Sequence, residues 1–507
     1  MPYLQRTDPL SEGAPSIHPQ APDPPRRSGL DEAVGAVLSS SLPGAARPPR
    51  AAIDAVLGAR GGAVQWQTQA ARALYKAARV RALLLTGRAD EAGALADREA
   101  LAAVSTITGV CAPAARALAF AAIAEAYLLT GRLRDAVACA GQVADYAAGA
   151  DDDRVLFTGH ALLAAAFTMN GEVAVGVDQL ASARRLVTAH GWQVTSWALT
   201  VTTVLTALRR GDVGEIEDAV CAFERSAWDP VQQTIHTLCR CHLYGARGEY
   251  ERAVSTAQSL VHGAAGSVAP SFLVDHLVAA QALALLQLGD PASVLSVVGE
   301  RASAPDHPVC LEALAATAHL QLTEPRKALR VTDRCVHRNP HHSPASLASV
   351  HVRRAVAYGR LRQTEHADAE FSRATHLAVE LGAVSPALGL DLGELAALHQ
   401  RLRRREPEFA RHLAALLPAN VSRTAPKPLA FRPPNLTKRE ALLASWLRTE
   451  CTLVDIAKAL HVSPNTIKTQ ARSLYRKLGV GSREEAVDLL TQTGLYPAPE
   501  GVCEGEG

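Results

Sequence analysis

The stretch Thr452-Leu-Val-Asp-Ile-Ala-Lys-Ala-Leu-His-Val-Ser-Pro-Asn-Thr-Ile-Lys-Thr-Gln-Ala-Arg-Ser-Leu-Tyr-Arg-Lys-Leu478 decides the fold of the C-terminal part of this 507-residue chain. Thr452 precedes Asp455 at capping-box spacing, and Ser463 precedes Pro464, which suits a first helical turn because it lacks an amide hydrogen. Two helices separated by so few residues are typical of a helix-turn-helix, whose second helix enters the major groove of DNA.

Similar signals flank this stretch on both sides. Thr437 is followed three residues later by Glu440, and Ser482 by Glu485, so both pairs fit a capping box. Gly479 follows the last apolar residue of the central helix, where a left-handed C-cap is expected. The sequence therefore predicts four helices, over residues 437–448, 452–460, 464–478 and 482–493.

The third of these helices has two distinct faces. Its apolar residues recur at helical spacing and form one stripe: Ile467, Ala471, Leu474 and Leu478. Its polar residues lie on the opposite side: Asn465, Lys468, Thr469, Arg472 and Arg476. Between Ser463 and Lys477 there are four cationic side chains and no carboxylate. A solvated face of an ordinary helical domain is the alternative, but caps, charge of one sign and tight helix spacing together favour DNA reading.

This region closely resembles the LuxR-type helix-turn-helix family. The resemblance rests on five motifs: Leu436-Thr-Lys-Arg-Glu440, Ile456-Ala-Lys-Ala-Leu460, Ser463-Pro-Asn-Thr-Ile-Lys468, Lys477-Leu-Gly-Val480 and Arg483-Glu-Glu-Ala486. Taken position by position, it implies that three residues read base edges: Lys468, Thr469 and Arg472. It implies phosphate contacts from four others: Ser463, Thr466, Arg476 and Lys477.

Two positions depart from the family pattern. Glu450 stands where the family usually has Gly, and a left-handed backbone there would cost Glu roughly 1 kcal/mol. Gln470 stands where His is common. These departures put the loop conformation and the preferred DNA site in question, but not DNA binding itself.

Upstream, a helix–turn–helix pattern recurs over residues 65–398. Turns are expected at Gly87, Gly131, Gly171, Gly211, Gly248 and Gly289, and Leu322-Thr323 keeps the frame without a glycine. The steps of about 34 to 44 residues indicate stacked helix pairs. The array loosely resembles tetratricopeptide repeats; the alternative is an unrelated α-helical domain. Both interpretations predict an all-α chain.

The remaining segments are expected to lack regular structure. Residues 1–64 are rich in proline and are expected to be largely disordered, with a short helix over 31–40 as the exception. Residues 399–433 are predicted to be a basic linker that can attract DNA phosphates, with a solvated helix end and linker as the equal alternative. The predicted DNA-binding domain spans 434–496, and residues 497–507 are expected to be a disordered tail.

Composition excludes several function classes. The formal net charge of +2 excludes a general polyanion binder, so basicity must act locally. The most apolar stretch, 112–129, is interrupted by Arg116 and Glu125, and the N-terminus has no apolar signal segment, so we expect neither a membrane span nor secretion. A cytoplasmic protein, located on the nucleoid when bound to DNA, is expected.

Neither a metal nor a catalytic site is predicted. Cys239 and Cys241 lack a partner pair, and the ligand-type residues Cys335, His337, His341 and His342 match no standard zinc spacing. No nucleophile elbow, zinc-hydrolase motif or dinucleotide-binding loop occurs in the sequence. We therefore expect no enzyme and no cofactor.

Together these features predict a sequence-specific transcription regulator, an activator whose repeat domain senses a ligand or protein partner. Its expected partners are double-stranded promoter DNA, RNA polymerase and a second copy of the chain, paired through residues 482–493. The arrangement resembles the C-terminal part of large MalT-like LuxR regulators, but no phosphate-binding loop occurs here, so ATP-driven switching is not carried over. The alternative is a protein-interaction scaffold with a minor or vestigial DNA-binding head.

Overall fold

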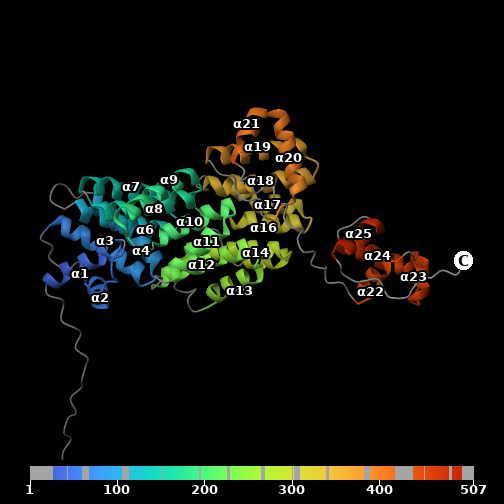
Figure 1. Ribbon diagram of the computed structural model, residues 1–507, viewed down its shortest axis with the longest axis horizontal. Helices are drawn as coiled ribbons and strands as arrows, with labels where there is room; N and C mark the ends of the chain where they lie inside the picture. The colour runs from blue at the N-terminus through green and yellow to red at the C-terminus, as the bar shows by residue number, and fades with distance from the viewer. Residues whose placement is uncertain are drawn as a thin grey trace, which may run out of the picture.

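The computed structural model describes most of the chain. The described residues are 27–42, 44–59, 68–105, 113–150, 152–192, 194, 196–224, 229–263, 269–299, 301, 309–337, 342–381, 389–416, 438–449, 451–478 and 482–493. Within these ranges the regular structure is helical and no strand occurs, which confirms the all-α fold class (Figure 1).

The helices follow one another with short connections. Before the C-terminal domain they are α1 Arg27–Ser39, α2 Arg50–Gly58, α3 Gln69–Leu85, α4 Ala89–Leu95, the π-helical η1 Ala96–Ala100, α5 Leu101–Ser105, α6 Pro113–Leu129, α7 Leu133–Ala150, α8 Asp153–Asn170, α9 Val173–His190, α10 Trp197–Arg210, α11 Val213–Glu224, α12 Pro230–Arg247, α13 Tyr250–Val261, α14 Ser271–Gln287, α15 Pro291–Gly299, α16 Leu311–Gln321, α17 Pro325–His337, α18 Pro344–Arg360, α19 Thr364–Glu380, α20 Leu392–Arg405 and α21 Pro407–Leu416. The C-terminal domain contains α22 Lys438–Leu447, α23 Leu453–Ala459, α24 Pro464–Leu478 and α25 Arg483–Thr493.

From α6 to α19 the helices form stacked antiparallel pairs. The first helix of each pair contacts the first helix of the next, in the order α6, α8, α10, α12, α14, α16 and α18. The second helix of each pair packs against the first, from α7 on α6 to α19 on α18. This stacking is the arrangement that the sequence period predicts, and it is compatible with the resemblance to tetratricopeptide repeats.

The turns within the pairs use a left-handed residue. All six predicted turn glycines have positive φ: Gly87, Gly131, Gly171, Gly211, Gly248 and Gly289. Thr323 adopts the same conformation, with φ 59°, at the turn that keeps the frame without glycine. Arg362, also at φ 59°, forms the turn between α18 and α19. The sequence analysis did not predict this turn, because it contains no left-handed glycine. Each non-glycine residue there carries a backbone cost of roughly 1 kcal/mol, so packing of the pair must outweigh it.

The N-terminal segment differs from expectation. Helices α1 and α2 both lie within residues 1–64, which were expected to be largely disordered, and α1 includes residues 31–39 of the short helix expected over 31–40. Val37 of α1 and Ile53 of α2 are fully buried in the same core as α3 and α6. Pro49 stands at the N-cap of α2, so the prolines flank these helices and leave the apolar residues between them free to pack.

The predicted basic linker also begins with helical structure. Helices α20 and α21 run through its first part, and Leu402 and Ala410 are buried against the end of the array. Arg401 Nε lies 2.6 Å from Asp368 Oδ1, and Arg405 Nη1 lies 3.1 Å from Asp368 Oδ2. These two arginines are therefore paired with a carboxylate of α19, which weakens their attraction for DNA phosphates. The rest of the linker, 417–433, lies outside the described residues.

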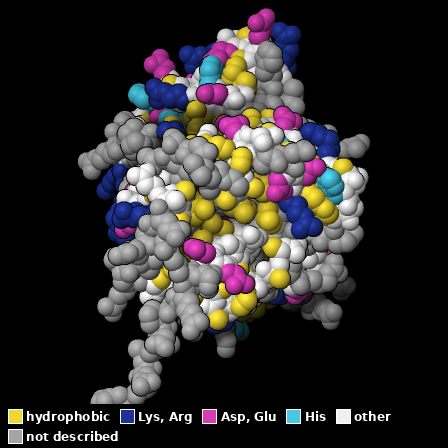
Figure 2. Space-filling model, turned by 90° about the vertical axis from the view of Figure 1, so that its left-hand side faces the viewer, with side chains coloured by type: hydrophobic (Ala, Val, Ile, Leu, Met, Phe, Trp, Pro, Cys, Tyr) yellow, Lys and Arg dark blue, Asp and Glu magenta, His cyan; other side chains and the backbone are white. Residues whose placement is uncertain are grey.

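The visible face at the N-terminal end of the array carries charge of both signs. Figure 2 shows hydrophobic side chains in its middle, with lysine or arginine and aspartate or glutamate side chains scattered around them. Such a face lacks the charge of one sign that attracts nucleic acid. No helix in the described part of the chain is both long and apolar enough to cross a membrane.

A buried polar network connects α3, α6, α10 and the N-terminus of α12. Arg81 of α3 donates to Glu125 of α6 and, through Nε at 3.1 Å, to Ser40 Oγ. Trp197 Nε1 of α10 donates to the other carboxylate oxygen of Glu125 at 2.9 Å. Asp229, the N-cap of α12, accepts from the backbone amide of Gln232 at 2.8 Å. Its electrostatic interactions with Arg81 and Glu125 connect it to the same network.

Asp229 predicts a pH-dependent stability. Burial raises the pKa of Asp229 to about 6, against the opposing influence of the Gln232 amide and Arg81. In the unfolded chain its pKa is about 3.9, so as pH rises from about 4 to about 6 the unfolded state loses its proton first and folding becomes less favourable. The accumulated cost at pH 7 is up to about 3 kcal/mol.

We therefore expect Asp229→Asn, which keeps an N-cap oxygen, to raise the free energy of unfolding at pH 7 but hardly at pH 4. Urea unfolding of both proteins at pH 4, 5, 6 and 7 measures this difference. A variant no more stable at pH 7 than at pH 4, relative to the parent protein, would contradict the burial argument.

Candidate nucleic-acid interface

Helices α22 to α25 form a separate unit with its own core (Figure 1). All four predicted helices are present, and each begins and ends within one residue of its predicted bounds. The predicted apolar stripe of α24 is buried in this core: Ile467, Ala471, Leu474 and Leu478. The helical period was thus sufficient to predict which face of α24 packs inward.

Side-chain caps start these helices as the sequence predicts. Thr452 accepts from the Asp455 amide, and Asp455 accepts from the Thr452 amide, which completes the capping box of α23. Ser482 Oγ accepts from the Glu485 amide at 3.1 Å. Thr437, the expected cap of α22, lies outside the described residues.

The turn between α23 and α24 is a Schellman motif. The Val462 amide donates to Ala457 O at 2.9 Å, and the His461 amide donates to Lys458 O at 3.1 Å. His461 takes the left-handed conformation that this motif needs, with φ 53°. The sequence analysis had considered a left-handed backbone at Glu450, which lies outside the described residues. Nothing in the sequence pattern indicated a left-handed conformation at His461.

Two polar contacts fix α24 and α25 against α22. Ser473 Oγ of α24 donates to Glu440 Oε1 of α22 at 3.0 Å. Arg483 Nη2 of α25 donates to the backbone oxygens of Leu447 and Thr449, at 3.2 and 2.8 Å. Arg483 thus satisfies carbonyls at the C-terminal end of α22, which gives the arginine of the Arg-x-x-Ala motif a structural role. These contacts orient α24 on a rigid support.

One face of α24 is exposed and carries the predicted base-reading residues. Lys468, Thr469 and Arg472 are all exposed, together with Asn465. At 3.6 residues per turn these four positions fall within about 100° around the helix axis. Neither Lys468 nor Arg472 forms an ion pair with a described residue. Both cations are therefore presented outward from one surface, as contact with a groove of DNA requires.

The third predicted base reader is partly engaged within its own helix. Thr469 Oγ1 donates to Asn465 O at 2.9 Å. The hydroxyl oxygen still has lone pairs to accept a hydrogen bond, and its methyl group is exposed with it. Thr469 is therefore suited to accepting from a base or to contacting a thymine methyl group.

The predicted phosphate contacts divide into two sets. Ser463 and Thr466 are exposed at the N-terminus of α24, and their hydroxyl oxygens lie 2.8 Å apart. Ser463 Oγ also accepts from the Thr466 amide at 3.1 Å. Hydroxyl groups at a helix N-terminus are well placed for a phosphate. Arg476 and Lys477 belong to the helix, but their side chains lie outside the described residues.

The comparison with known families agrees with this geometry. Residues 434–490 match the family model of the bacterial regulatory proteins of the luxR family. The C-terminal domain is therefore a LuxR-family helix-turn-helix domain, as its motifs implied, and that family's domain binds DNA. The match does not include the helical array, and no curated protein matches the chain.

Proposed function

We propose that this protein is a sequence-specific transcription regulator that reads promoter DNA with the exposed face of α24. The observation that carries the proposal is the pairing of a buried apolar stripe with an exposed, carboxylate-free polar face on one helix. Lys468 and Arg472 donate to acceptors on guanine, and Thr469 contacts a neighbouring base. Ser463, Thr466, Arg476 and Lys477 hold the phosphates and set the register.

We further propose that the helical array controls this head. An array of stacked pairs offers an extended surface to a ligand or a protein partner. An effector that binds more tightly to the DNA-binding conformation than to the inactive one increases the fraction of molecules whose C-terminal domain can bind DNA. In this proposal the protein is an activator that contacts RNA polymerase in the cytoplasm, and two copies pair through α25 on two half-sites.

The base-reading assignment is tested at Arg472. We expect Arg472→Ala to weaken binding to the specific site by roughly 1–3 kcal/mol, because the bidentate contact with guanine is lost. Arg472→Lys is the matched control: it keeps the charge but not the planar pair of donors, so it should lose base discrimination while keeping binding to unrelated DNA.

The measurement has two steps. DNA that co-precipitates with the full chain is sequenced to find the site, and affinities for that site and for a scrambled duplex are then compared at several salt concentrations. Equal loss on both duplexes in Arg472→Ala would assign Arg472 to phosphate contact. Unchanged affinity on both would remove it from the interface.

A further inference from the structure

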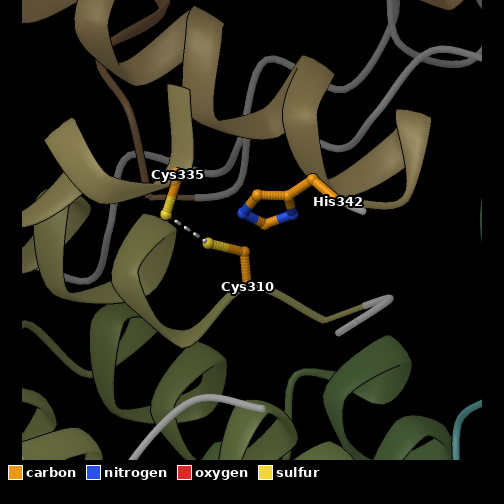
Figure 3. Close-up of side chains that lie close together, drawn as sticks. All are labelled: Cys310, Cys335 and His342. Carbon is orange, nitrogen blue, oxygen red and sulfur yellow. Dashed lines mark hydrogen bonds between the residues drawn. The ribbon is translucent and has the colours of Figure 1, made fainter. Parts of the chain in front are cut away.

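Three buried ligand-type side chains meet where three successive helices of the array come together. Cys310 precedes α16, Cys335 lies near the end of α17, and His342 lies two residues before α18. Their residues are 5%, 3% and 4% exposed. Figure 3 shows the imidazole of His342 beside the two sulfur atoms, each carried by a different segment.

The distances suit a tetrahedral metal centre. Cys310 Sγ and Cys335 Sγ are 3.7 Å apart, and one ligand atom from each of the three residues lies within 4.8 Å of the others. With zinc–sulfur bonds of about 2.3 Å, tetrahedral geometry places two sulfur ligands about 3.8 Å apart. The two thiols are thus already at the spacing at which one ion would hold them.

We propose that Cys310, Cys335 and His342 form a binding site for a thiophilic divalent cation of the Zn²⁺ class. Two sulfur atoms and an imidazole are ligands that such ions prefer, whereas Mg²⁺ and Ca²⁺ require oxygen. Glu312 lies beside this group of three ligands, and its Oε2 accepts a hydrogen bond from Cys310 Sγ at 3.5 Å. Arg334 Nη2 lies 2.5 Å from Glu312 Oε1 and orients that carboxylate.

A divalent ion would bind the two cysteines as thiolates. Burial, together with the hydrogen bond to Cys335, raises the pKa of Cys310, so without metal Cys310 is a neutral thiol. The ion would displace the protons and compensate the two thiolates in an apolar pocket that includes Ala313 and Val350. The buried guanidinium of Arg353 interacts electrostatically with Cys310.

The expected role of the ion is to clamp α16, α17 and α18. A metal ion that is bound only in the folded state contributes to folding stability. This inference does not depend on DNA binding. The sequence analysis noticed Cys335 and His342 but predicted no metal, because their spacing matches no standard site. It did not consider Cys310, which lies 25 residues before Cys335.

Cobalt substitution of the full-length, reduced protein tests the proposal. Titration with Co²⁺ should produce near-ultraviolet sulfur-to-cobalt absorption and the intense visible bands of tetrahedral cobalt, and one equivalent of Zn²⁺ should remove both. Zn²⁺ should also raise the melting temperature. Cys310→Ser combined with Cys335→Ser should lose all three responses. The matched control, Cys239→Ser combined with Cys241→Ser, removes another pair of buried cysteines and should keep them.

His342→Gln provides a second test that keeps both thiols. We expect cobalt to bind at least tenfold more weakly and its visible bands to shift, because one ligand is replaced. The proposal is overturned if the parent protein shows no sulfur-to-cobalt band, or if the band persists in the Cys310 and Cys335 double variant. Oxidation of these two thiols to a disulfide in air, with no cobalt bound by the reduced protein, would also overturn it.

Discussion

Leu474→Ala is expected to unfold the C-terminal domain and thereby abolish specific DNA binding. Leu474 is fully buried on the inner face of α24, among residues of all four helices of the domain. Truncating a leucine in such a core costs about 2–5 kcal/mol, because the transfer energy is lost and a cavity remains. A domain of this size has a total stability of only about 5 kcal/mol, so most of it would be lost.

Circular dichroism of the helical signal during heating, together with binding to the selected DNA site, measures the effect. Leu442→Ala is the matched control, since Leu442 is 45% exposed on α22 and should change stability by no more than about 0.5 kcal/mol. Normal DNA binding by Leu474→Ala would show that α24 does not depend on this core for its orientation.

The fold of the C-terminal domain could be predicted because its signals are local. A cap such as Thr452 and the apolar stripe that includes Leu474 depend on residues three or four positions apart, which sequence periodicity reports directly. The positive-φ glycines of the array are equally local signals. The turn at Arg362 was not predicted, because an arginine, unlike a glycine, gives no signal in the sequence for a left-handed conformation.

Contacts distant in sequence could not be predicted in this way. Val37 and Ile53 lie in a proline-rich segment, and only the packed array shows that they belong to the core. From the sequence, Arg401 was expected to contribute to a basic linker, and only the structure shows that it is paired with Asp368. The closeness of Cys310 and Cys335 likewise cannot be predicted without knowing how α16 and α17 pack. In each case the tertiary partner, and not a local pattern, determines the role.

Arg81→Met is expected to destabilise the array by about 3–5 kcal/mol. Glu125 is buried, and its charge is compensated by Arg81, which also donates to Ser40 O at 3.2 Å. Removing the arginine leaves a buried carboxylate whose remaining hydrogen-bond partner among the described residues is the neutral Trp197 indole. An uncompensated buried charge costs far more than the ion pair itself contributes. Thermal or urea unfolding at pH 7 measures the loss.

A double variant separates the charge from the packing. In Arg81→Met combined with Glu125→Gln the unpaired charge is gone, while the glutamine oxygen can still accept from Trp197 Nε1. We expect this protein to be more stable than Arg81→Met alone, because the desolvation of the carboxylate is the main cost. If the double variant is as unstable as the single one, the loss must come from the hydrogen bonds of Arg81 to Ser40 or from its packing, and not from the unpaired carboxylate. The sequence showed Glu125 only as a charge interrupting an apolar helix; its position opposite Arg81 explains how the helix can bury it.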